Sequence, residues 1–229
     1  MMTKTLQRIA TLRFLFENRR HFRDFILAKE RDKNAIWRKP GRWYDVDIDK
    51  YTGMVAEVKG DFAEIGVFEG ETFAKLIPIA HKQHKVAHAF DSFEGLAAPG
   101  QFDWRPEGEF DVGGVKGFRR LMRKRGVAEE QYLAWDGFIP HCFQKAPDNL
   151  AFSFVLLDVD NYEPTREGLA WAWPRLNVGG VLALDDFYPN GEGEASKAIK
   201  EFLRERGDFD IVGFENFQLA LRKLGSTVK

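Results

Sequence analysis

Short apolar runs alternate with amphipathic segments along most of the chain beyond residue 60. Runs of strand length cover residues 61–66, 85–91, 131–136, 152–158 and 181–186. Segments with apolar residues at helical spacing cover residues 70–83, 115–126, 164–176 and 194–206. Strands that alternate with helices predict a parallel sheet with helices on both faces. The run that ends at Asp158 is almost entirely apolar, which is typical of a strand buried on both sides.

The N-terminal part of the chain follows a different pattern. Residues 3–30 carry apolar side chains at steps of three and four, as an amphipathic helix does. Pro40 and Gly41 end this periodicity, because neither residue favours the interior of a helix. We therefore predict a basic helical extension over residues 1–58 and a main domain over residues 59–229.

The C-terminal part of the chain predicts a hairpin. Two apolar runs, residues 209–214 and 217–222, are separated only by Glu215 and Asn216. The predicted fold class is thus α/β: a Rossmann-like doubly wound sheet, mostly parallel, with an antiparallel C-terminal hairpin strand and an N-terminal helical extension.

Composition and charge narrow the classes of function. The 229 residues are 44% hydrophobic and 30% charged, and the formal net charge is −1, so nucleic acid is not an expected partner. Cys142 is the only cysteine, which excludes an internal disulfide and a thiolate zinc cluster. The sequence has no apolar run of roughly 18 residues and no secretory leader pattern. We expect a cytoplasmic protein.

The positive charge is concentrated in the extension. Residues 1–45 hold twelve Lys and Arg against five acidic residues, a net charge of +7, which leaves −8 for the rest of the chain. Such a basic helix can serve as a dimerisation arm, a lid over an acceptor site or a membrane-surface anchor. Because its apolar face carries several Phe residues, we expect burial against this protein or a second copy before membrane attachment.

Four of the predicted strands end in an acidic residue. The acids are Glu64, Asp91, Asp158 and Asp185. The carboxyl ends of parallel strands meet at one edge of a sheet, where doubly wound proteins bind their ligands. The series predicts a nucleotide-type cofactor with a divalent cation beside it.

The first strand-to-helix turn, residues 64–70, predicts the type of cofactor. Gly66 supplies a tight turn and Gly70 allows close packing at the helix start, but the position between them is Phe68. A dinucleotide site requires a glycine there, because the backbone approaches a pyrophosphate. S-adenosylmethionine has no pyrophosphate, and its ammonium group can approach the Glu64 carboxylate. Phe68 therefore argues against the alternative, an NAD(P)-dependent oxidoreductase.

The end of the second strand and the end of the third strand supply the remaining cofactor contacts. Asp91 follows Gly70 by 21 residues, close to the spacing at which an acid meets a ribose diol in nucleotide-binding folds. After the third strand, Asp136 can accept a hydrogen bond from an adenine amine, and Gly137 turns the chain. Phe138 either lies along the adenine ring or is a core aromatic residue in a turn.

Two pairs of acids follow neighbouring strands. Asp158 and Asp160 lie two residues apart, and Asp185 and Asp186 end the next strand. Carboxylates this close repel one another, and a hard cation such as Mg²⁺ relieves the repulsion. We predict Asp158, Asp185 and Asp186 as metal ligands with Asp160 in reserve; the alternative is that some of these side chains point into solvent.

Four motifs resemble those of the macrocin O-methyltransferase family, class I methyltransferases that act on sugars of macrolide antibiotics. The matching segments are residues 64–72, 90–96, 157–165 and 179–187, of which Asp-Ser-Phe-Glu-Gly-Leu at 91–96 is the most specific. The resemblance implies S-adenosylmethionine as methyl donor, Mg²⁺-assisted O-methylation and strand-end aspartates as metal ligands. It adds Thr72 and Ser92, which lie within the motifs, to the cofactor-binding residues.

The chain departs from the family pattern in two places. After the third strand the family commonly has Gly-Trp-Phe, whereas this chain has Gly-Phe-Ile at 137–139. The Gly- and Pro-rich stretch 95–114 reads as a long loop, and loops of this length are usually functional lids or disordered. Its part from residue 97 onward lacks histidine. The sequence therefore leaves the general base open among His141, Asp160 and an acid of the loop 103–111.

The function that the sequence favours is an S-adenosylmethionine-dependent O-methyltransferase. Its substrate would be a small hydroxylated molecule such as a sugar or another vicinal diol, because a cation held by the strand-end acids can bind adjacent hydroxyls. The competing hypotheses are the NAD(P)-dependent oxidoreductase and a non-catalytic partner protein that keeps the fold. Retention of all four acidic strand ends argues against the non-catalytic protein.

Overall fold

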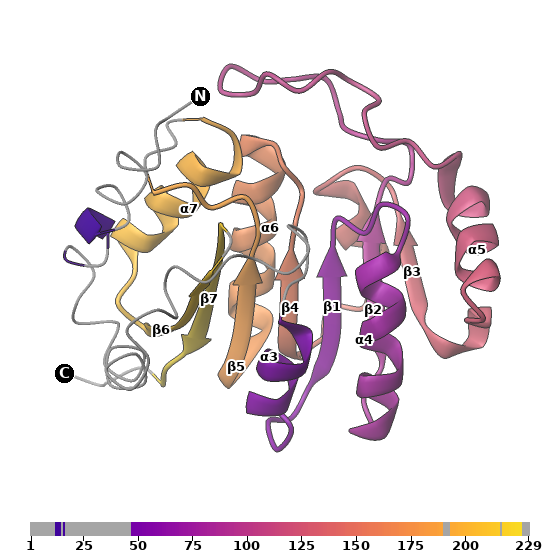
Figure 1. Cartoon of the computed structure of the whole chain (residues 1–229), viewed down its shortest axis with the longest axis horizontal. Helices are drawn as coiled ribbons and strands as arrows, with labels where there is room; N and C mark the ends of the chain where they lie inside the picture. The colour runs from indigo at the N-terminus through magenta and orange to yellow at the C-terminus, as the bar shows by residue number, and fades with distance from the viewer. Residues whose placement is uncertain (1–11, 15, 17–46, 190–192, 216, 226–229) are drawn as a thin grey trace.

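The computed structural model describes residues 12–14, 16, 47–189, 193–215 and 217–225. These residues form a seven-stranded sheet with the strand order β3-β2-β1-β4-β5-β7-β6 (Figure 1). Neighbouring strands from β3 to β5 run parallel, whereas β7 pairs antiparallel with both β5 and β6. The predicted doubly wound α/β sheet with an antiparallel C-terminal hairpin is confirmed.

The elements follow one another in the predicted order. The strands are β1 (Asp61–Ile65), β2 (Ala87–Asp91), β3 (Leu133–Asp136), β4 (Phe152–Leu157), β5 (Leu176–Leu184), β6 (Phe209–Glu215) and β7 (Gln218–Lys223). The helices are α3 (Ile48–Met54), α4 (Glu71–Lys82), α5 (Gly114–Lys124), α6 (Tyr162–Arg175) and α7 (Glu194–Glu205). Two short 3-10 helices, η3 (Glu129–Gln131) and η4 (His141–Lys145), flank β3.

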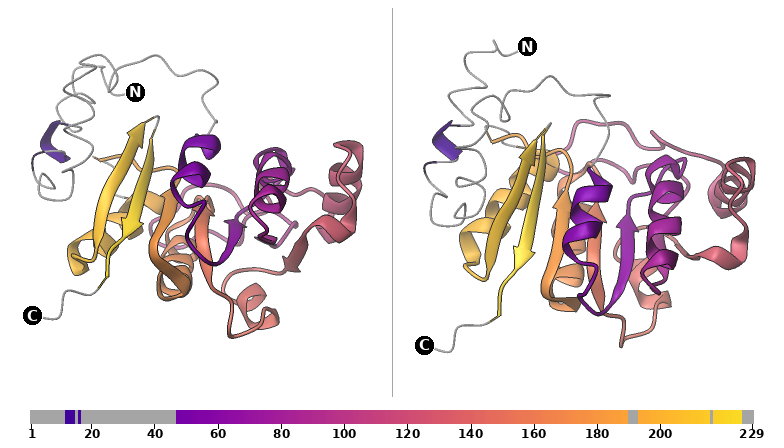
Figure 2. Two further views of the ribbon diagram at one scale, coloured as in Figure 1. Left: turned by 90° about the horizontal axis from the view of Figure 1, so that it is seen from below. Right: turned by 60° about the horizontal axis from the view of Figure 1, so that its bottom comes forward.

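Helices cover the sheet on both faces, because its strands are apolar on both sides. All six residues of β4 are buried, as the apolar run predicts. Alternate residues separate between two cores: Phe154 and Leu156 pack with α3, α4 and α5, whereas Val155 and Leu157 pack with α6 and α7. The three resulting layers are visible when the molecule is viewed along the strands (Figure 2). This packing fixes the strand ends, from which the acidic residues project.

Most boundaries differ from the sequence-based expectation by only one or two residues, and those of the third and fifth strands bear on the site. The strand expected at 131–136 starts at Leu133, because η3 occupies residues 129–131. The strand expected at 181–186 runs from Leu176 to Leu184 instead. The strand therefore includes Gly179 and Gly180. The φ of +84° at Gly179 accompanies a register irregularity against β4. Asp185 and Asp186 consequently follow the strand and lie in the loop after it.

Helix α3 was not foreseen as part of the packed body. Asp47 caps it by accepting a hydrogen bond from the Lys50 amide at 3.1 Å, and Ile48 and Tyr51 are buried under the sheet. Tyr51 fits against Gly213 of β6, where an added Cβ would lie 1.9 Å from the tyrosine hydroxyl. The boundary predicted at residue 58 stays a prediction.

Most of the predicted helix 3–30 lies outside the described residues. Of its few described positions, Phe14 is buried, with its ring centroid 4.9 Å from that of Phe187 and 5.4 Å from that of Phe214. Within the described part of the chain, no helix combines the length and the apolar character that a membrane span requires.

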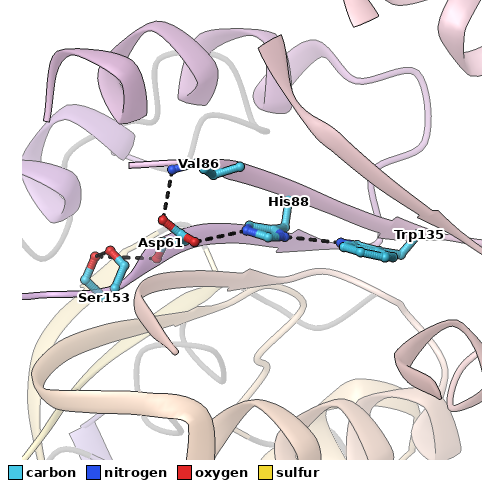
Figure 3. Close-up of polar contacts among 6 residues, drawn as sticks. Asp61, Val86, His88, Trp135 and Ser153 are labelled. Atoms are coloured by element: carbon cyan, nitrogen blue, oxygen red, sulfur yellow. Dashed lines mark hydrogen bonds and ion pairs between the residues drawn. The ribbon is translucent and has the colours of Figure 1, made fainter. Parts of the chain in front are cut away.

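A partly buried polar chain ties together β1, β2 and β3 (Figure 3). The Trp135 indole donates to His88 Nδ1 at 3.2 Å, and His88 Nε2 lies 3.2 Å from Asp61 Oδ2. Because an indole N–H can only donate, His88 is the neutral tautomer that donates from Nε2 to Asp61. The other Asp61 oxygen accepts from the Val86 amide at 2.9 Å.

Asp61→Asn tests the energetic weight of this chain. Either orientation of the Asn amide would place a donor against His88 Nε2 or the Val86 amide, so we expect a loss of about 1–3 kcal/mol in urea unfolding at pH 7. Although burial acts in the opposite direction, hydrogen bonds from His88 and Val86 lower the pKa of Asp61. A lowered pKa stabilises the fold above about pH 4 and loses that effect as pH falls further. The difference between the two proteins should therefore shrink below pH 4.

The matched control for this experiment is Asp148→Asn, at an exposed loop aspartate. We expect this variant to unfold within about 0.5 kcal/mol of the parent protein. If Asp61→Asn were equally harmless, the chain from Trp135 to Asp61 would not stabilise the sheet.

Candidate functional site

A cavity of about 600 Å³ opens at the carboxyl ends of the parallel strands. Residues that follow β1, β2, β4 and β5 line it, together with part of the loop between β2 and α5. That loop runs across the top of the molecule above the strand ends (Figure 1). The cavity therefore lies where a doubly wound sheet is expected to bind a ligand.

The turn after β1 approaches the chain after β4 too closely for any side chain. Gly66 has a φ of +84°, and an added Cβ would lie 1.7 Å from the Asp158 carbonyl oxygen. Gly70, with a φ of +74°, begins α4; a Cβ there would lie 2.6 Å from Met122 Sδ and 2.9 Å from the Phe118 ring. The first glycine is required by backbone contact and the second by helix packing, as the sequence predicts.

The carboxylate of Asp91 is bound by the backbone of this turn. Its Oδ2 accepts from the Val67 and Phe68 amides at 2.5 and 3.0 Å, and its Oδ1 accepts from the Phe93 amide at 2.6 Å. A carboxylate has about four acceptor positions, so Asp91 keeps one of them, on Oδ1, for another donor. The sequence-based expectation assigned both oxygens to a ribose; the structure shows that Asp91 also shapes the turn.

Glu64 is a buried carboxylate with an unsatisfied oxygen. Its side chain is only 3% exposed, it lines the cavity, and Oε2 has no hydrogen-bond partner among the described residues. Burial, with a further contribution from Asp91, raises the pKa of Glu64 well above its ordinary value. A positively charged ligand group in the cavity would supply the missing partner.

Four aspartates lie together among the residues that line the cavity. Ligand oxygens of Asp158, Asp160 and Asp186 are all within 4.8 Å of one another, and Asp185 lines the same cavity. Burial first, and then the neighbouring carboxylates, raise the pKa of Asp158 well above its usual range. The same causes raise the pKa of Asp160 to about 8 and that of Asp185 to about 6.

The backbone holds two of these aspartates in an unusual conformation. Asp160 and Asp186 have φ values of +58° and +53°, a region that non-glycine residues rarely adopt. The Asp160 carbonyl accepts from the Ala195 amide at 2.8 Å, and the Asp186 carbonyl accepts from the Ser196 hydroxyl at 2.7 Å. The first turn of α7 thus fixes both residues. A set of clustered, all-oxygen donors with mutually raised pKa values fits a hard divalent cation such as Mg²⁺.

The loop between β2 and α5 adds a cation that sequence reasoning missed. Arg105 lines the cavity, and its Nε lies 3.2 Å from Asp160 Oδ1. Its guanidinium lies 5.4 Å from the centre of the Phe110 ring, which in turn packs edge-on against Phe68 at 5.2 Å. The sequence gives no signal of this contact, because only the acids of the loop were candidates for a base and a long loop has no periodic pattern that would place an arginine.

A comparison with known families accounts for the arrangement. The sequence model of the family described as Macrocin-O-methyltransferase (TylF) matches residues 49–211, which is more than half of the chain. The chain belongs to this family. The match includes the turn after β1, Asp91 at the end of β2, the four aspartates and all of α3 except its first residue.

One curated relative of this protein comes from Streptomyces olivaceus. It is named 8-demethyl-8-(2,3-dimethoxy-alpha-L-rhamnosyl)-tetracenomycin-C 4'-O-methyltransferase and is 26% identical over 147 residues, which cover 59% of this chain. The matched region spans only 56% of that relative's length.

Solved structures share the fold at low sequence identity. The O-methyltransferase NovP aligns with a TM-score of 0.62 at 18% identity over 78% of this chain and 79% of its own. The calicheamicin methyltransferase CalS11 has the same TM-score at 20% identity over 76% of each chain. TomG of Streptomyces achromogenes, solved in complex with SAM, has a TM-score of 0.55 at 13% identity over 84% of this chain and 94% of its own. At such identities these likenesses establish the fold.

The structure brings most of the predicted site residues to the cavity. The predicted site residues that line the cavity are Glu64, Gly66, Thr72, Asp91, Ser92, Phe138, Asp158, Asp160, Asp185 and Asp186. Gly70 lies behind the lining, under α5. Ser92 also shapes its own turn, because its hydroxyl donates to the Gly95 carbonyl at 2.8 Å.

Besides Gly70, three predicted residues lie outside the lining of the cavity. Asp136 forms an ion pair with Lys145 at 3.0 Å, which lowers the pKa of Asp136, and the Gly137 amide donates to the Asp91 carbonyl at 2.9 Å. His141 is exposed at the start of η4. Their roles in binding or catalysis stay predictions.

Gly66→Ala tests the close approach of the turn to Asp158. The added methyl would overlap the Asp158 carbonyl and take up a left-handed φ, so we expect a loss of about 3 kcal/mol or more in unfolding free energy, or no folded protein. Gly126→Ala is the matched control, because Gly126 has a φ of +80° but no atom within 4 Å of an added Cβ. That variant should lose only about 1–2 kcal/mol. Equal losses in urea denaturation would contradict the backbone contact.

Proposed function

We propose that this protein is an S-adenosylmethionine-dependent O-methyltransferase that methylates a sugar hydroxyl with the assistance of Mg²⁺. The observation that carries the proposal is a single cavity lined both by the unpartnered Glu64 carboxylate and by the aspartate cluster. Family membership favours methyl transfer over the oxidoreductase alternative. A SAM complex of the similarly folded TomG supports the choice of donor.

The donor would be held by the residues after β1 and β2. Glu64 would accept a hydrogen bond from the ammonium group, and Asp91 would use its remaining acceptor position for a ribose hydroxyl. Phe138 is 39% exposed on the cavity wall, where its ring can lie along the adenine. Asp136 can reach the adenine amine only if it gives up part of its contact with Lys145. These contacts hold the adenosine and the amino-acid tail, which leaves the methyl group free to face the aspartates.

The acceptor would be bound on the aspartate side. Asp158, Asp185 and Asp186 would hold the cation, which when bound lowers the pKa of a coordinated hydroxyl. The positive charge of the bound cation would favour the ionised form of Asp160. Asp160 would then accept the hydroxyl proton as the O–CH₃ bond forms and the S–CH₃ bond breaks, and the sulfur leaves as a neutral thioether. Asp160 is better placed than His141 or the acids of the loop 103–111, because it lines the cavity and they do not. The role of these residues is to align the two reactants and to take one proton.

A sugar is the acceptor class that the relatives support. The curated relative is named as a 4'-O-methyltransferase of a rhamnosyl group. A sugar presents adjacent hydroxyls, and an all-oxygen cation site with open positions can bind two of them. The cavity would then hold the donor and the sugar together.

Calorimetry with S-adenosylhomocysteine tests the donor and metal halves separately. We expect the parent protein to bind S-adenosylhomocysteine and, in a second titration, MgCl₂. Asp158→Asn should lose Mg²⁺ binding and reduce methyl transfer at least about 100-fold, yet bind S-adenosylhomocysteine within about threefold of the parent. Methyl transfer that survives both this substitution and a chelator would disprove the metal role. Failure to bind S-adenosylhomocysteine would disprove the donor site.

Glu64 gives the proposed donor site a defined dependence on pH. Burial raises the pKa of Glu64 in the cavity, which favours the protonated carboxyl, whereas an incoming ammonium favours the ionised form. Donor binding should therefore release a proton, and affinity should rise with pH until it passes the raised pKa. Calorimetry in buffers of different ionisation enthalpy measures this release. Glu64→Gln should abolish it and weaken donor binding about tenfold; proton release that persists in Glu64→Gln would assign it to another group.

A further inference from the structure

Arg105 is a fixed cation at the edge of the aspartate cluster. Its side chain is 33% exposed, and it contacts the 14% exposed side chain of Asp160. Glu109 Oε1 lies 3.5 Å from its Nη1, and the Phe110 ring lies under its guanidinium. Although burial acts in the opposite direction, Asp160 and then Asp186 raise the pKa of Arg105, so it carries its charge at any working pH.

The loop that carries Arg105 does not need this ion pair to stay in place. Asp103 Oδ1 accepts from the Tyr162 amide at 2.7 Å, and the Phe102 ring packs edge-on against Tyr162 at 4.8 Å. The Phe102 carbonyl also accepts from the Glu194 amide at 2.9 Å. These contacts hold the loop to the first turns of α6 and α7 near Arg105. They, rather than the ion pair with Asp160, set the position of the Arg105 guanidinium.

Further backbone bonds close the loop on itself. The Leu96 amide donates to the Glu109 carbonyl at 2.8 Å, and the Gly108 amide donates to the Leu96 carbonyl at 2.9 Å. Glu94 and Asp111 form an isolated β-bridge. The loop is therefore held at its base as well as at its tip. The main effect of the contact between Arg105 and Asp160 is to place a positive charge beside the aspartate cluster, not to hold the loop in place.

We propose that Arg105 is a positioning residue that pairs with Asp160 and thereby keeps it out of the metal ligand set. This inference rests on the proposed function and deepens it. The distances alone group Asp158, Asp160 and Asp186 as a potential metal triplet, with Asp185 on the same cavity wall. Arg105 occupies one oxygen of Asp160, so three aspartates remain for one divalent cation.

Charge balance supports this division of roles. One divalent cation offsets two of the four aspartate charges, and Arg105 offsets a third. A second divalent cation near Asp160 would lie against a guanidinium and would be repelled. Asp160 therefore stays outside the ligand set of the cation.

Metal affinity distinguishes this role from simple attachment of the loop. Loss of the positive charge in Arg105→Gln should tighten binding of MgCl₂ by roughly three- to tenfold in calorimetry on the full chain, because a repelling charge is removed and Asp160 is released. The same variant should lower kcat at least about tenfold, with the KM for the donor within about threefold. Arg105→Lys keeps the charge and should retain parental metal affinity and part of the activity.

The control is Arg166→Gln, an arginine of α6 whose side chain is 51% exposed. It should leave metal affinity and turnover unchanged. If Arg105→Gln binds Mg²⁺ as the parent does or more weakly, Arg105 only fastens the loop and the inference is wrong, while the proposed function stands. If the parent protein binds S-adenosylhomocysteine but no Mg²⁺, the metal half of the proposed function and this inference both fail.

Discussion

Repulsion among four carboxylates at one edge of a parallel sheet is the constraint around which the upper half of this protein is organised. Asp158, Asp160, Asp185 and Asp186 are brought together by the pairing of β4 with β5, and their burial makes the repulsion costly. The first turns of α6 and α7 begin beside them, so the positive ends of two helix dipoles face the cluster. Arg105 adds a full positive charge from a third direction. The surrounding elements thus reduce the repulsion without removing it, which is the state expected of a site that binds a cation.

The two ends of the sheet show opposite solutions for buried polar groups. At the carboxyl edge, Phe68, Asp160 and Asp186 adopt positive φ angles, and Glu64 has an oxygen without a partner. At the other edge, Asp61 and His88 use their polar atoms in hydrogen bonds to neighbouring strands (Figure 3). The strained and unsatisfied groups at the carboxyl edge lie where a ligand can relieve them, and a hydrogen-bonded network joins the strands near the other edge.

The sequence predicted the fold well because the pattern of strands and helices depends on local periodicity. It also predicted which acids share the cavity, since the ends of adjacent parallel strands must meet. It could not show that Asp91 binds the backbone of Val67, Phe68 and Phe93, because those bonds depend on how two turns approach each other. Nor could it place Arg105, since contacts made by a long loop have no periodic signal. His141 was considered for its chemistry alone, and its position in η4 shows how little residue type says about location.

The geometry between the two halves of the cavity is set by backbone rather than by side chains. Gly66 lies against the Asp158 carbonyl, and the Asp158 amide donates to the Ile65 carbonyl at 2.8 Å. The turn proposed to hold the donor and the first proposed metal ligand are therefore parts of one pair of hydrogen-bonded strands, and neither can shift without the other. The acceptor side is formed partly by the loop between β2 and α5, where Phe68, Phe110 and Arg105 meet through ring packing and a cation–π contact. In the proposed function, the sheet would fix the direction of methyl transfer and this loop would set the shape of the acceptor pocket, where substitutions can change the acceptor without disturbing the donor.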